Sequence, residues 1–189
     1  MSKQTLRRVF EITILLLFIF SFYNFTTTGR DKSFDKLPIL SQTELQDFRS
    51  SLNAIVNQSQ ILTKTYQDEI GKWRFKQYDN STMISVTDSF IPKFENITNI
   101  ARNMTFPKDL KYIHDALVNS LKSETDSYKH FKNYLMSGNK TEDEISTDLL
   151  TKALEYEMTY SRFLSMPSQN SSQTVATLLD FGYNLVFNF

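Results

Sequence analysis

The side chains best suited to chemistry in this sequence are carboxylates and phenols that fall in or beside the apolar stripes of predicted helices. Glu124 occupies a stripe position between Leu121 and Tyr128, and Glu157 lies next to a stripe that holds Tyr160. A carboxylate buried there needs a hydrogen-bonding or charged partner. Such a polar, aromatic cluster either binds a small cationic or polar ligand or forms a satisfied structural network. The predicted ligand-binding residues are Trp73, Glu124, Tyr128, Tyr156, Glu157 and Tyr160.

Metal and cofactor chemistry has little support in the residue types. Helical bundles hold carboxylate-bridged metals through Glu-x-x-His pairs, but Lys111 stands three residues before His114 and Ser127 three residues before His130. The sequence has no cysteine, which excludes thiolate metal sites and cysteine nucleophiles. No phosphate-binding glycine loop or dinucleotide fingerprint is present. We therefore expect no metal, no cofactor and no enzymatic activity, with His130 paired to Asp126 on the surface and His114 at the edge of its stripe.

The composition favours helices and carries no electrostatic sign of a nucleic-acid partner. The 189 residues include only 4 Gly and 4 Pro, too few for the closely spaced turns of a β fold. Lys and Arg together number 21, as do Asp and Glu, so the formal net charge is zero. The expected class is all-α, with no binding to nucleic acids.

Apolar residues recur at three- and four-residue steps in four stretches, which predicts four amphipathic helices. Their expected ranges are 42–76, 83–104, 107–138 and 141–166. Ser41 with Glu44, and Thr141 with Glu144, form capping-box patterns at the first and fourth helices. Short connections make consecutive helices run in opposite directions. The predicted fold is an up-down-up-down four-helix bundle over residues 42–166, with a kink near Pro92 in its second helix.

The N-terminal region has the pattern of a membrane segment. Lys3, Arg7 and Arg8 precede an apolar run over residues 9–25. Seventeen residues is the lower limit for a spanning helix, so a transmembrane anchor competes with a cleaved signal peptide. Bulky aromatic residues where a cleavage site needs small ones favour the anchor. We expect residues 1–8 in the cytoplasm, a single span of the cell membrane, a linker over 26–40, and the helical domain outside.

Seven asparagines begin an N-x-S/T triplet, the acceptor pattern for N-glycosylation. The alternative is that a surface rich in Ser, Thr and Asn produces the triplets by chance. Asn24 lies against the expected membrane face and is the poorest acceptor. The remaining glycosylation candidates are Asn57, Asn80, Asn96, Asn103, Asn139 and Asn170.

Residues 167–189 form an apolar C-terminal tail, whose last sixteen residues carry a single charge at Asp180. A segment of this composition is expected to be buried. It packs on the bundle, lies in the membrane interface, or docks on another subunit, and the sequence leaves these alternatives open. The tail is too short and too interrupted by polar residues to be a second span.

Taken together, these features resemble the small, cysteine-free, sequon-rich, singly anchored surface proteins of ammonia-oxidising archaea. The resemblance rests on the Lys3/Arg7/Arg8 anchor, the seven sequons and the helices rich in Thr, Asn, Lys and Ile, and it assigns no functional residue. It implies a cell-envelope setting beside a membrane complex. The expected function is non-enzymatic binding of a protein partner, as an accessory or assembly subunit of such a complex. The alternative is a sensory or solute-capture bundle that binds a small ligand at the Glu124 cluster.

Overall fold

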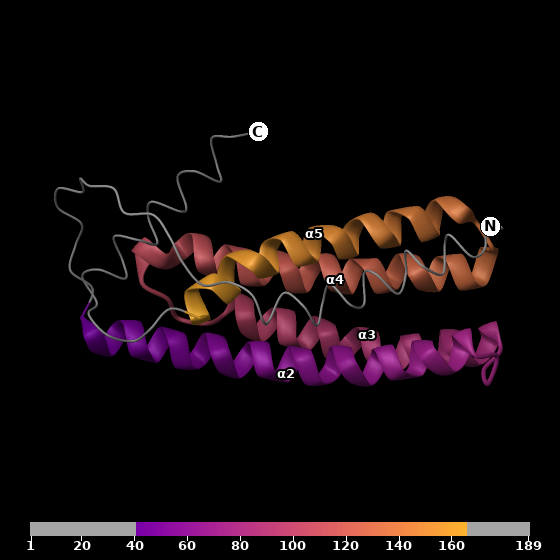
Figure 1. Cartoon of the computed structure of the whole chain (residues 1–189), viewed down its shortest axis with the longest axis horizontal. Helices are drawn as coiled ribbons and strands as arrows, with labels where there is room; N and C mark the ends of the chain where they lie inside the picture. The colour runs from indigo at the N-terminus through magenta and orange to yellow at the C-terminus, as the bar shows by residue number, and fades with distance from the viewer. Residues whose placement is uncertain (1–40, 166–189) are drawn as a thin grey trace. The chain divides into compact units, whose positions relative to one another are not determined.

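The computed structural model describes residues 41–165, which belong to one compact unit, Leu37–Phe189. The described residues form four α-helices and no strand, which confirms the predicted class. The elements are α2 (Gln42–Arg74), α3 (Asn80–Arg102), the short 3-10 turn η1 (Lys108–Leu110), α4 (Lys111–Ser137) and α5 (Lys140–Ser165) (Figure 1). The predicted anchor 9–25, the linker 26–40, the tail 167–189 and the sequons at Asn24 and Asn170 lie outside the described residues.

Side-chain and glycine caps set several helix ends where the sequence predicts them. The Ser41 hydroxyl accepts the Glu44 backbone N–H at 3.2 Å, and the Glu44 carboxylate accepts the Ser41 N–H at 3.2 Å. This confirms the capping box of α2. α4 ends at Gly138, whose φ of 69° is the left-handed conformation that glycine adopts at little cost.

The start of α5 differs from the prediction. Its first turn is capped by Asn139, whose side-chain oxygen accepts the Thr141 N–H at 3.1 Å, and the helix begins at Lys140. Thr141 therefore lies inside the first turn, and it is not the capping residue. The reason is local, since an asparagine two residues earlier already satisfies an orphan amide of the helix.

α2 ends and α3 begins within a short connection. α2 stops at Arg74, two residues before its expected end at 76, and Phe75 follows it with 81% of its surface exposed. The Asp79 carboxylate then accepts the Thr82 N–H at 2.7 Å and caps α3. α3 continues as one helix through Pro92.

Consecutive helices run in opposite directions, so the first and last described residues meet at one end of the bundle (Figure 1). The Arg49 guanidinium near the start of α2 donates to the carbonyl oxygens of Phe163 and Leu164, at 2.7 and 3.2 Å. The rings of Phe48 and Phe163 lie 5.5 Å apart between centroids. The described part of the chain therefore begins and ends at the same end of the bundle.

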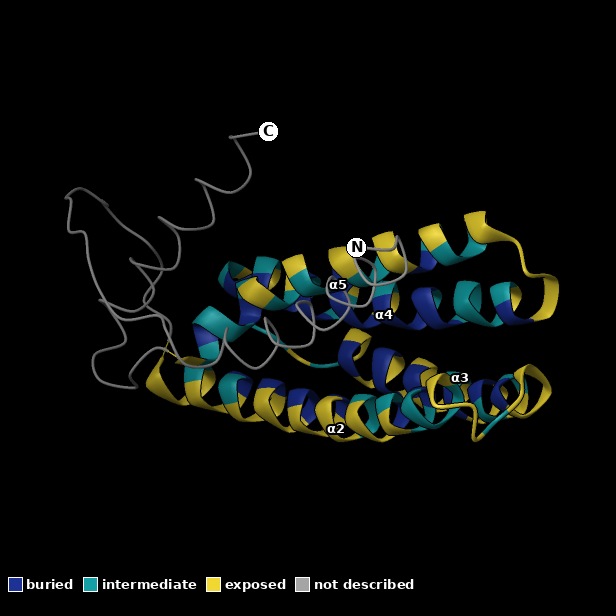
Figure 2. Ribbon diagram, turned by 45° about the vertical axis from the view of Figure 1, so that its right-hand side comes forward, coloured by how far each residue is buried: buried dark blue, intermediate teal, exposed yellow. Residues whose placement is uncertain are grey.

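Two apolar clusters fill the interior. At the end where α2 starts, all four helices contribute to a cluster that includes Phe48, Leu117 and Phe163. Towards the opposite end, the second cluster is built around Tyr66, Phe94 and Tyr128 and contains residues of α2, α3 and α4 only. Figure 2 shows the buried residues along the inward faces of the helices. α5 thus shares the core at one end of the bundle and rests mainly on α4 at the other.

Small residues form the seam between α4 and α5. The Ser120 hydroxyl donates to the carbonyl oxygen of Ala153 at 2.8 Å. The Ser127 hydroxyl donates to the carbonyl oxygen of Ser146 at 2.7 Å. A short side chain that bonds to the facing backbone requires the two helix axes to approach closely. This seam holds α5 in place where the larger apolar residues are absent.

Candidate functional site

The buried carboxyl of Glu124 lies at the centre of the polar residues in the bundle. One oxygen, Oε1, accepts the hydroxyl of Thr63 from α2 at 2.6 Å and the hydroxyl of Tyr128 from α4 at 2.8 Å. Burial raises the pKa of Glu124, and these two hydrogen bonds oppose the rise. The prediction that this stripe position needs a hydroxyl partner is met by Tyr128 and by Thr63, which the sequence analysis did not single out.

An aromatic layer adjoins this carboxyl. The ring of Tyr66 meets the ring of Tyr128 edge-on, 4.5 Å between centroids, and Phe94 lies 4.8 Å from Tyr128. The Tyr66 hydroxyl pairs with the Thr87 hydroxyl at 2.8 Å, and Thr87 donates to the carbonyl oxygen of Met83. The polar atoms of this layer therefore form hydrogen bonds with one another, as in a rigid structural network.

A second carboxyl, that of Glu157 on α5, faces the same interior. Burial raises the pKa of Glu157 to about 7, and the negative charge of Glu124 adds to the rise. The pKa of Tyr160 is raised by its own burial and then by the charge of Glu157. Among residues 41–165, the Glu157 carboxyl has no hydrogen-bond or ion-pair partner. Two carboxyls thus share the bundle interior without a cation between them.

The structure brings together four of the six predicted ligand-binding residues, Glu124, Tyr128, Glu157 and Tyr160, and it separates the other two. The Trp73 indole donates to the side-chain oxygen of Asn80 at 2.9 Å and packs edge-on against Phe131, 5.4 Å between centroids. It therefore belongs to the end of the bundle where α2 meets α3. The residue of α2 that donates to the Glu124 carboxyl is Thr63.

Tyr156 was also wrongly placed. It is 38% exposed, whereas Glu157 is half-buried. A path of three- and four-residue steps from Ala153 to Tyr160 passes equally well through residue 156 or residue 157, so spacing alone does not choose between them. The packing of α5 on α4 turns Glu157 inward and Tyr156 outward.

The two histidines have partners other than those predicted. Nδ1 of His130 lies 2.7 Å from the Glu142 carboxylate on α5, and Asp126 instead pairs with Lys122 at 2.7 Å. His114 is buried and not at a stripe edge: its ring stacks on Phe106, 3.9 Å between centroids. Its Nε2 lies 3.0 Å from the carbonyl oxygen of Ala101. Both histidines therefore serve as links between segments of the bundle.

Within residues 41–165, no group of three or more His, Cys, Asp or Glu side chains is placed to hold a metal ion. The carboxyl pair of Glu124 and Glu157 comprises only two such side chains, which interact through their charges. Hydroxyl groups surround it, and these are neutral at physiological pH.

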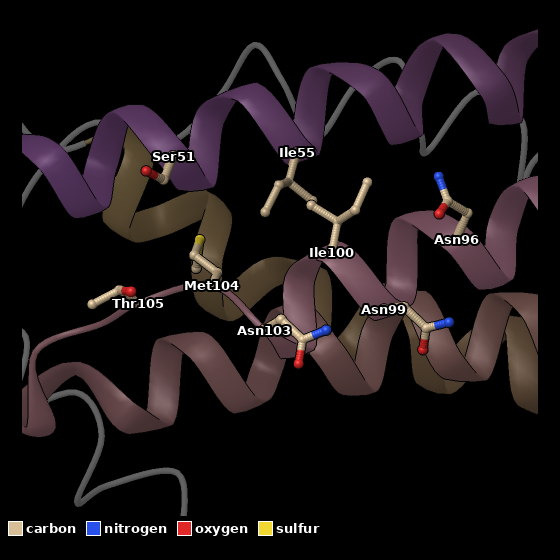
Figure 3. Close-up of a pocket in the computed structure, with 8 residues that line it drawn as sticks. All are labelled: Ser51, Ile55, Asn96, Asn99, Ile100, Asn103, Met104 and Thr105. Atoms are coloured by element: carbon tan, nitrogen blue, oxygen red, sulfur yellow. The ribbon is translucent and has the colours of Figure 1, made fainter.

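A second candidate site lies on the outside of the bundle, in a groove between α2 and α3. It contains two hollows of about 660 and 490 Å³, which share Asn96. Figure 3 shows Ile55 of α2 and Ile100 of α3 pointing towards one another across the larger hollow. The larger hollow is lined by Ser51, Ile55, Asn96, Asn99, Ile100, Asn103, Met104 and Thr105, and the smaller by Gln58, Ile61, Leu62, Thr65, Pro92, Lys93, Asn96 and Ile97.

The surface around this groove is poor in charge. We call it the α2/α3 face, meaning residues 50–65 of α2 together with residues 92–105 of α3 and its C-terminal turn. No charged residue occurs between Arg49 and Lys64, although 22% of the chain is charged. Lys93 is the only charged residue lining either hollow. Ile61 projects from this face with 70% of its surface exposed.

Sequence reasoning missed the α2/α3 face. The usable signal is the uncharged run on α2, because the outward positions of a solvated helix normally carry charged residues. Asn53, Asn57 and Gln60 are exposed along that run, which Arg49 and Lys64 bound. Charge depletion of this kind is typical of a surface that contacts another protein.

The sequons fall in two kinds of position. Asn139 lies in the exposed turn before α5, Asn103 follows the last residue of α3, and Asn80 is the first residue of α3. Asn57 and Asn96 lie inside helices, and the third residues of their triplets, Ser59 and Thr98, are buried. The Asn80 amide donates one of its two N–H groups to the carbonyl oxygen of Leu135 at 3.3 Å. Occupancy of all these sequons stays a prediction.

Comparison of the chain with protein-family models, with curated proteins and with solved structures finds no match. No helix within residues 41–165 has the length and apolar character needed to cross a membrane.

Proposed function

We propose that this protein is a non-enzymatic, membrane-anchored interaction protein whose helical bundle lies outside the cell membrane and contacts a protein partner. Residues 9–25 would supply the single span, with residues 1–8 in the cytoplasm. An accessory or assembly subunit of a cell-envelope membrane complex is the role that fits these features best. The sequence resembles surface proteins of archaea, and this resemblance agrees with the proposed location of the bundle outside the cell membrane.

The α2/α3 face is the observation that carries the proposal. It combines an apolar floor, formed by Ile55, Ile97 and Met104, with a rim of side-chain amides from Asn96 and Asn99. Amide groups hydrogen-bond without the desolvation cost of a full charge. An apolar floor with a polar rim that is poor in charge is the composition of protein–protein contact surfaces.

The two ends of the described bundle support a membrane-tethered arrangement. The first and last described residues lie at the same end of the bundle, near Arg49 and Phe163. In the proposed arrangement this end faces the membrane, and the α2/α3 face lies at the side of the bundle.

The test is extraction of the full-length protein from its own membrane in a mild detergent, followed by identification of what co-purifies. We expect a stoichiometric protein partner whose retention depends on the α2/α3 face. Ile100→Lys places a charge beside the larger hollow and should release the partner. Met136→Lys, at an exposed position on α4, is the control and should retain it. Retention unaffected by Ile100→Lys would count against this surface.

The anchor is tested separately by its chemistry. An uncleaved anchor keeps Met1 to Phe25 in the mature protein and sediments with membranes after an alkaline carbonate wash. A mature chain that begins near Gly29, released into the soluble fraction, would show instead that the segment is a signal peptide. In that case the bundle would be a soluble exported protein, and the contact surface would be tested without detergent.

A second candidate function is binding of a small cationic or polar ligand inside the bundle. One observation favours it: the half-buried Glu157 carboxyl has no partner among the described residues and faces Glu124 and Tyr160. A ligand cation there would neutralise one of the two carboxyls and contact the neighbouring phenol rings. Native mass spectrometry should detect a retained small molecule in the wild-type protein and lose it in Glu157→Gln. An identical mass for the bare chain in both would argue against this function.

A further inference from the structure

We infer that the partner of the α2/α3 face is a second copy of this chain, aligned side by side with the first and pointing in the same direction. This inference rests on the proposed function, since it names the protein that the proposed contact surface binds. The shared direction belongs to the proposed arrangement, in which every copy turns the same end of the bundle towards one membrane. The symmetry is then a two-fold axis parallel to the helices.

The charge pattern favours a second copy over a partner of different composition. A surface that meets itself across a two-fold axis places each charge near its own duplicate, so like charges destabilise such contacts. The stretch from Ser50 to Thr63 carries no charge and meets this condition, and Lys64 at its end lines neither hollow. Two charged residues of the face on α3 bond within their own chain: Glu95 pairs with Lys129 of α4 at 2.9 Å, and Arg102 donates to the Asn99 side chain at 2.9 Å. Lys93, at the edge of the smaller hollow, lies 4.4 Å from the centre of the Phe90 ring of its own helix, which holds its ammonium group beside α3.

The shape of the α2/α3 face also complements a second copy of the same face. Each hollow has an exposed isoleucine at its own height along the bundle, Ile100 at the larger hollow and Ile61 at the smaller. A two-fold axis parallel to the helices conserves height, so each isoleucine meets the hollow of the same height on the other copy. Side chains that enter holes between facing helices are the usual way in which helix pairs pack.

The size of the face predicts a reversible dimer. Sixteen residues of α2 extend about 24 Å at a rise of 1.5 Å per residue. Two neighbouring helices are together about 20 Å wide, so the face covers roughly 500 Å² per copy. Doubling that area gives about 1,000 Å², the lower end of specific interfaces. Attachment of both chains to one membrane raises their effective concentration and compensates for the modest area.

The inference makes a definite statement about the sequons. Asn96 and Asn103 line the larger hollow, so a glycan on either would occupy the space that the second copy fills. We therefore expect Asn96 and Asn103 to be unmodified in the mature protein. Asn139, in the turn before α5, is far along the chain from this face and is free of that restriction.

The chain has no cysteine, so one introduced thiol reports contact without background. Asn96 lines both hollows and thus lies near the expected axis. Asn96→Cys in the full-length protein, in native membranes, should form a disulfide-linked dimer on mild oxidation, which requires the two Cα atoms to come within about 7 Å. Thr151→Cys, exposed on α5, is the matched control and should remain monomeric under the same oxidation.

Second-site variants show whether the crosslink depends on the face. Ile61→Lys or Ile100→Lys, added to Asn96→Cys, should slow crosslinking by about tenfold or more, because each buries a charge in the contact. Met136→Lys should leave the rate unchanged, since Met136 is 64% exposed on α4. Unchanged helicity in circular dichroism separates loss of contact from loss of fold.

Several results would overturn the inference. Equal crosslinking of Asn96→Cys and Thr151→Cys would mean random collision. A glycan on Asn96 or Asn103 of the mature protein would fill the groove and exclude the second copy. Crosslinking that occurs only after deletion of residues 174–189 would show that the tail covers this face in the complete chain. If the protein is monomeric but releases a different co-purifying protein when Ile100 becomes Lys, the proposed function stands and the second copy is the wrong partner.

Discussion

Tyr128 donates its hydroxyl hydrogen bond to the carboxyl of Glu124 over 2.8 Å, one turn earlier in α4. The same carboxyl oxygen accepts the hydroxyl of Thr63 at 2.6 Å, so a single atom joins α2 to α4 at mid-bundle. Burial raises the pKa of Glu124 and of Tyr128, and the Tyr128 hydroxyl donates to the Glu124 carboxyl. The stability of the bundle should therefore depend on these hydroxyls and on pH.

Thr63→Val removes one hydroxyl from this arrangement and preserves the shape of the side chain. We expect the free energy of unfolding to fall by about 1–3 kcal/mol at pH 8, because a buried acceptor loses its donor. The Thr63 bond lowers the pKa of Glu124, so its loss matters more when that carboxyl is ionised. Urea denaturation across a series of pH values measures both effects. Thr63→Ser keeps the hydroxyl and should recover most of the loss, and a defect of equal size at every pH would contradict this account.

Glu157 should make the bundle less stable as the pH rises towards neutrality. Its pKa in the folded protein is about 7, and an unfolded glutamic acid titrates near pH 4.3. The folded protein holds this proton more tightly, so the contribution is complete below about pH 4.3 and is lost as the pH passes through 7. Because the side chain is half-buried, the loss should be on the order of 1–3 kcal/mol.

Glu157→Gln removes this titrating group, so the free energy of unfolding should decrease less between pH 4.5 and pH 7.5 than it does in the wild-type protein. The slope is measured by denaturant titration across that range. Glu155→Gln, at an exposed position of the same helix, is the matched control and should keep the wild-type slope. A wild-type slope in Glu157→Gln would place the titrating group elsewhere.

Larger side chains at the seam between α4 and α5 should destabilise the bundle. Ser127 is buried against Ser146, and its hydroxyl bonds to the facing backbone. Ser127→Val adds volume where the helices approach closely, and it should lower the free energy of unfolding by about 1–3 kcal/mol. Ser127→Ala removes only the hydrogen bond and should cost about 0.5–1.5 kcal/mol. Thermal unfolding ranks the two, and a valine variant as stable as the alanine variant would show that the seam has spare room.

Phe163 should be among the costliest side chains of α5 to truncate. It is almost completely buried, and its ring contacts Phe48 where the first and last described helices meet. Phe163→Ala should reduce the free energy of unfolding by about 3–5 kcal/mol, since a cavity remains. Met158→Ala, on the exposed side of α5, should change it by less than about 0.5 kcal/mol. Chemical denaturation of both variants is the measurement, and a small effect of Phe163→Ala would mean that the two helices separate readily there.

The helices themselves were predictable from the amino-acid sequence. Four apolar stripes, the Ser41/Glu44 capping box and the Gly138 terminator are local signals, because they depend on residues within one or two turns of each other. The stripe of α4, including Glu124 and Tyr128, is buried as its spacing predicts. Half of the candidate site was thus visible in a single helix.

The remaining relations depend on tertiary packing. Whether Tyr156 or Glu157 faces inward depends on the rotation of α5 against α4, which three- and four-residue steps do not specify. The Thr63 partner of Glu124 and the Glu142 partner of His130 lie on other helices, 61 and 12 residues away in the chain. The groove between α2 and α3 exists only because two helices that are each amphipathic on their own pack side by side. Periodicity tells which residues of a helix are apolar, but contact between helices decides which polar groups meet, because those distances are set by packing and not by separation along the chain.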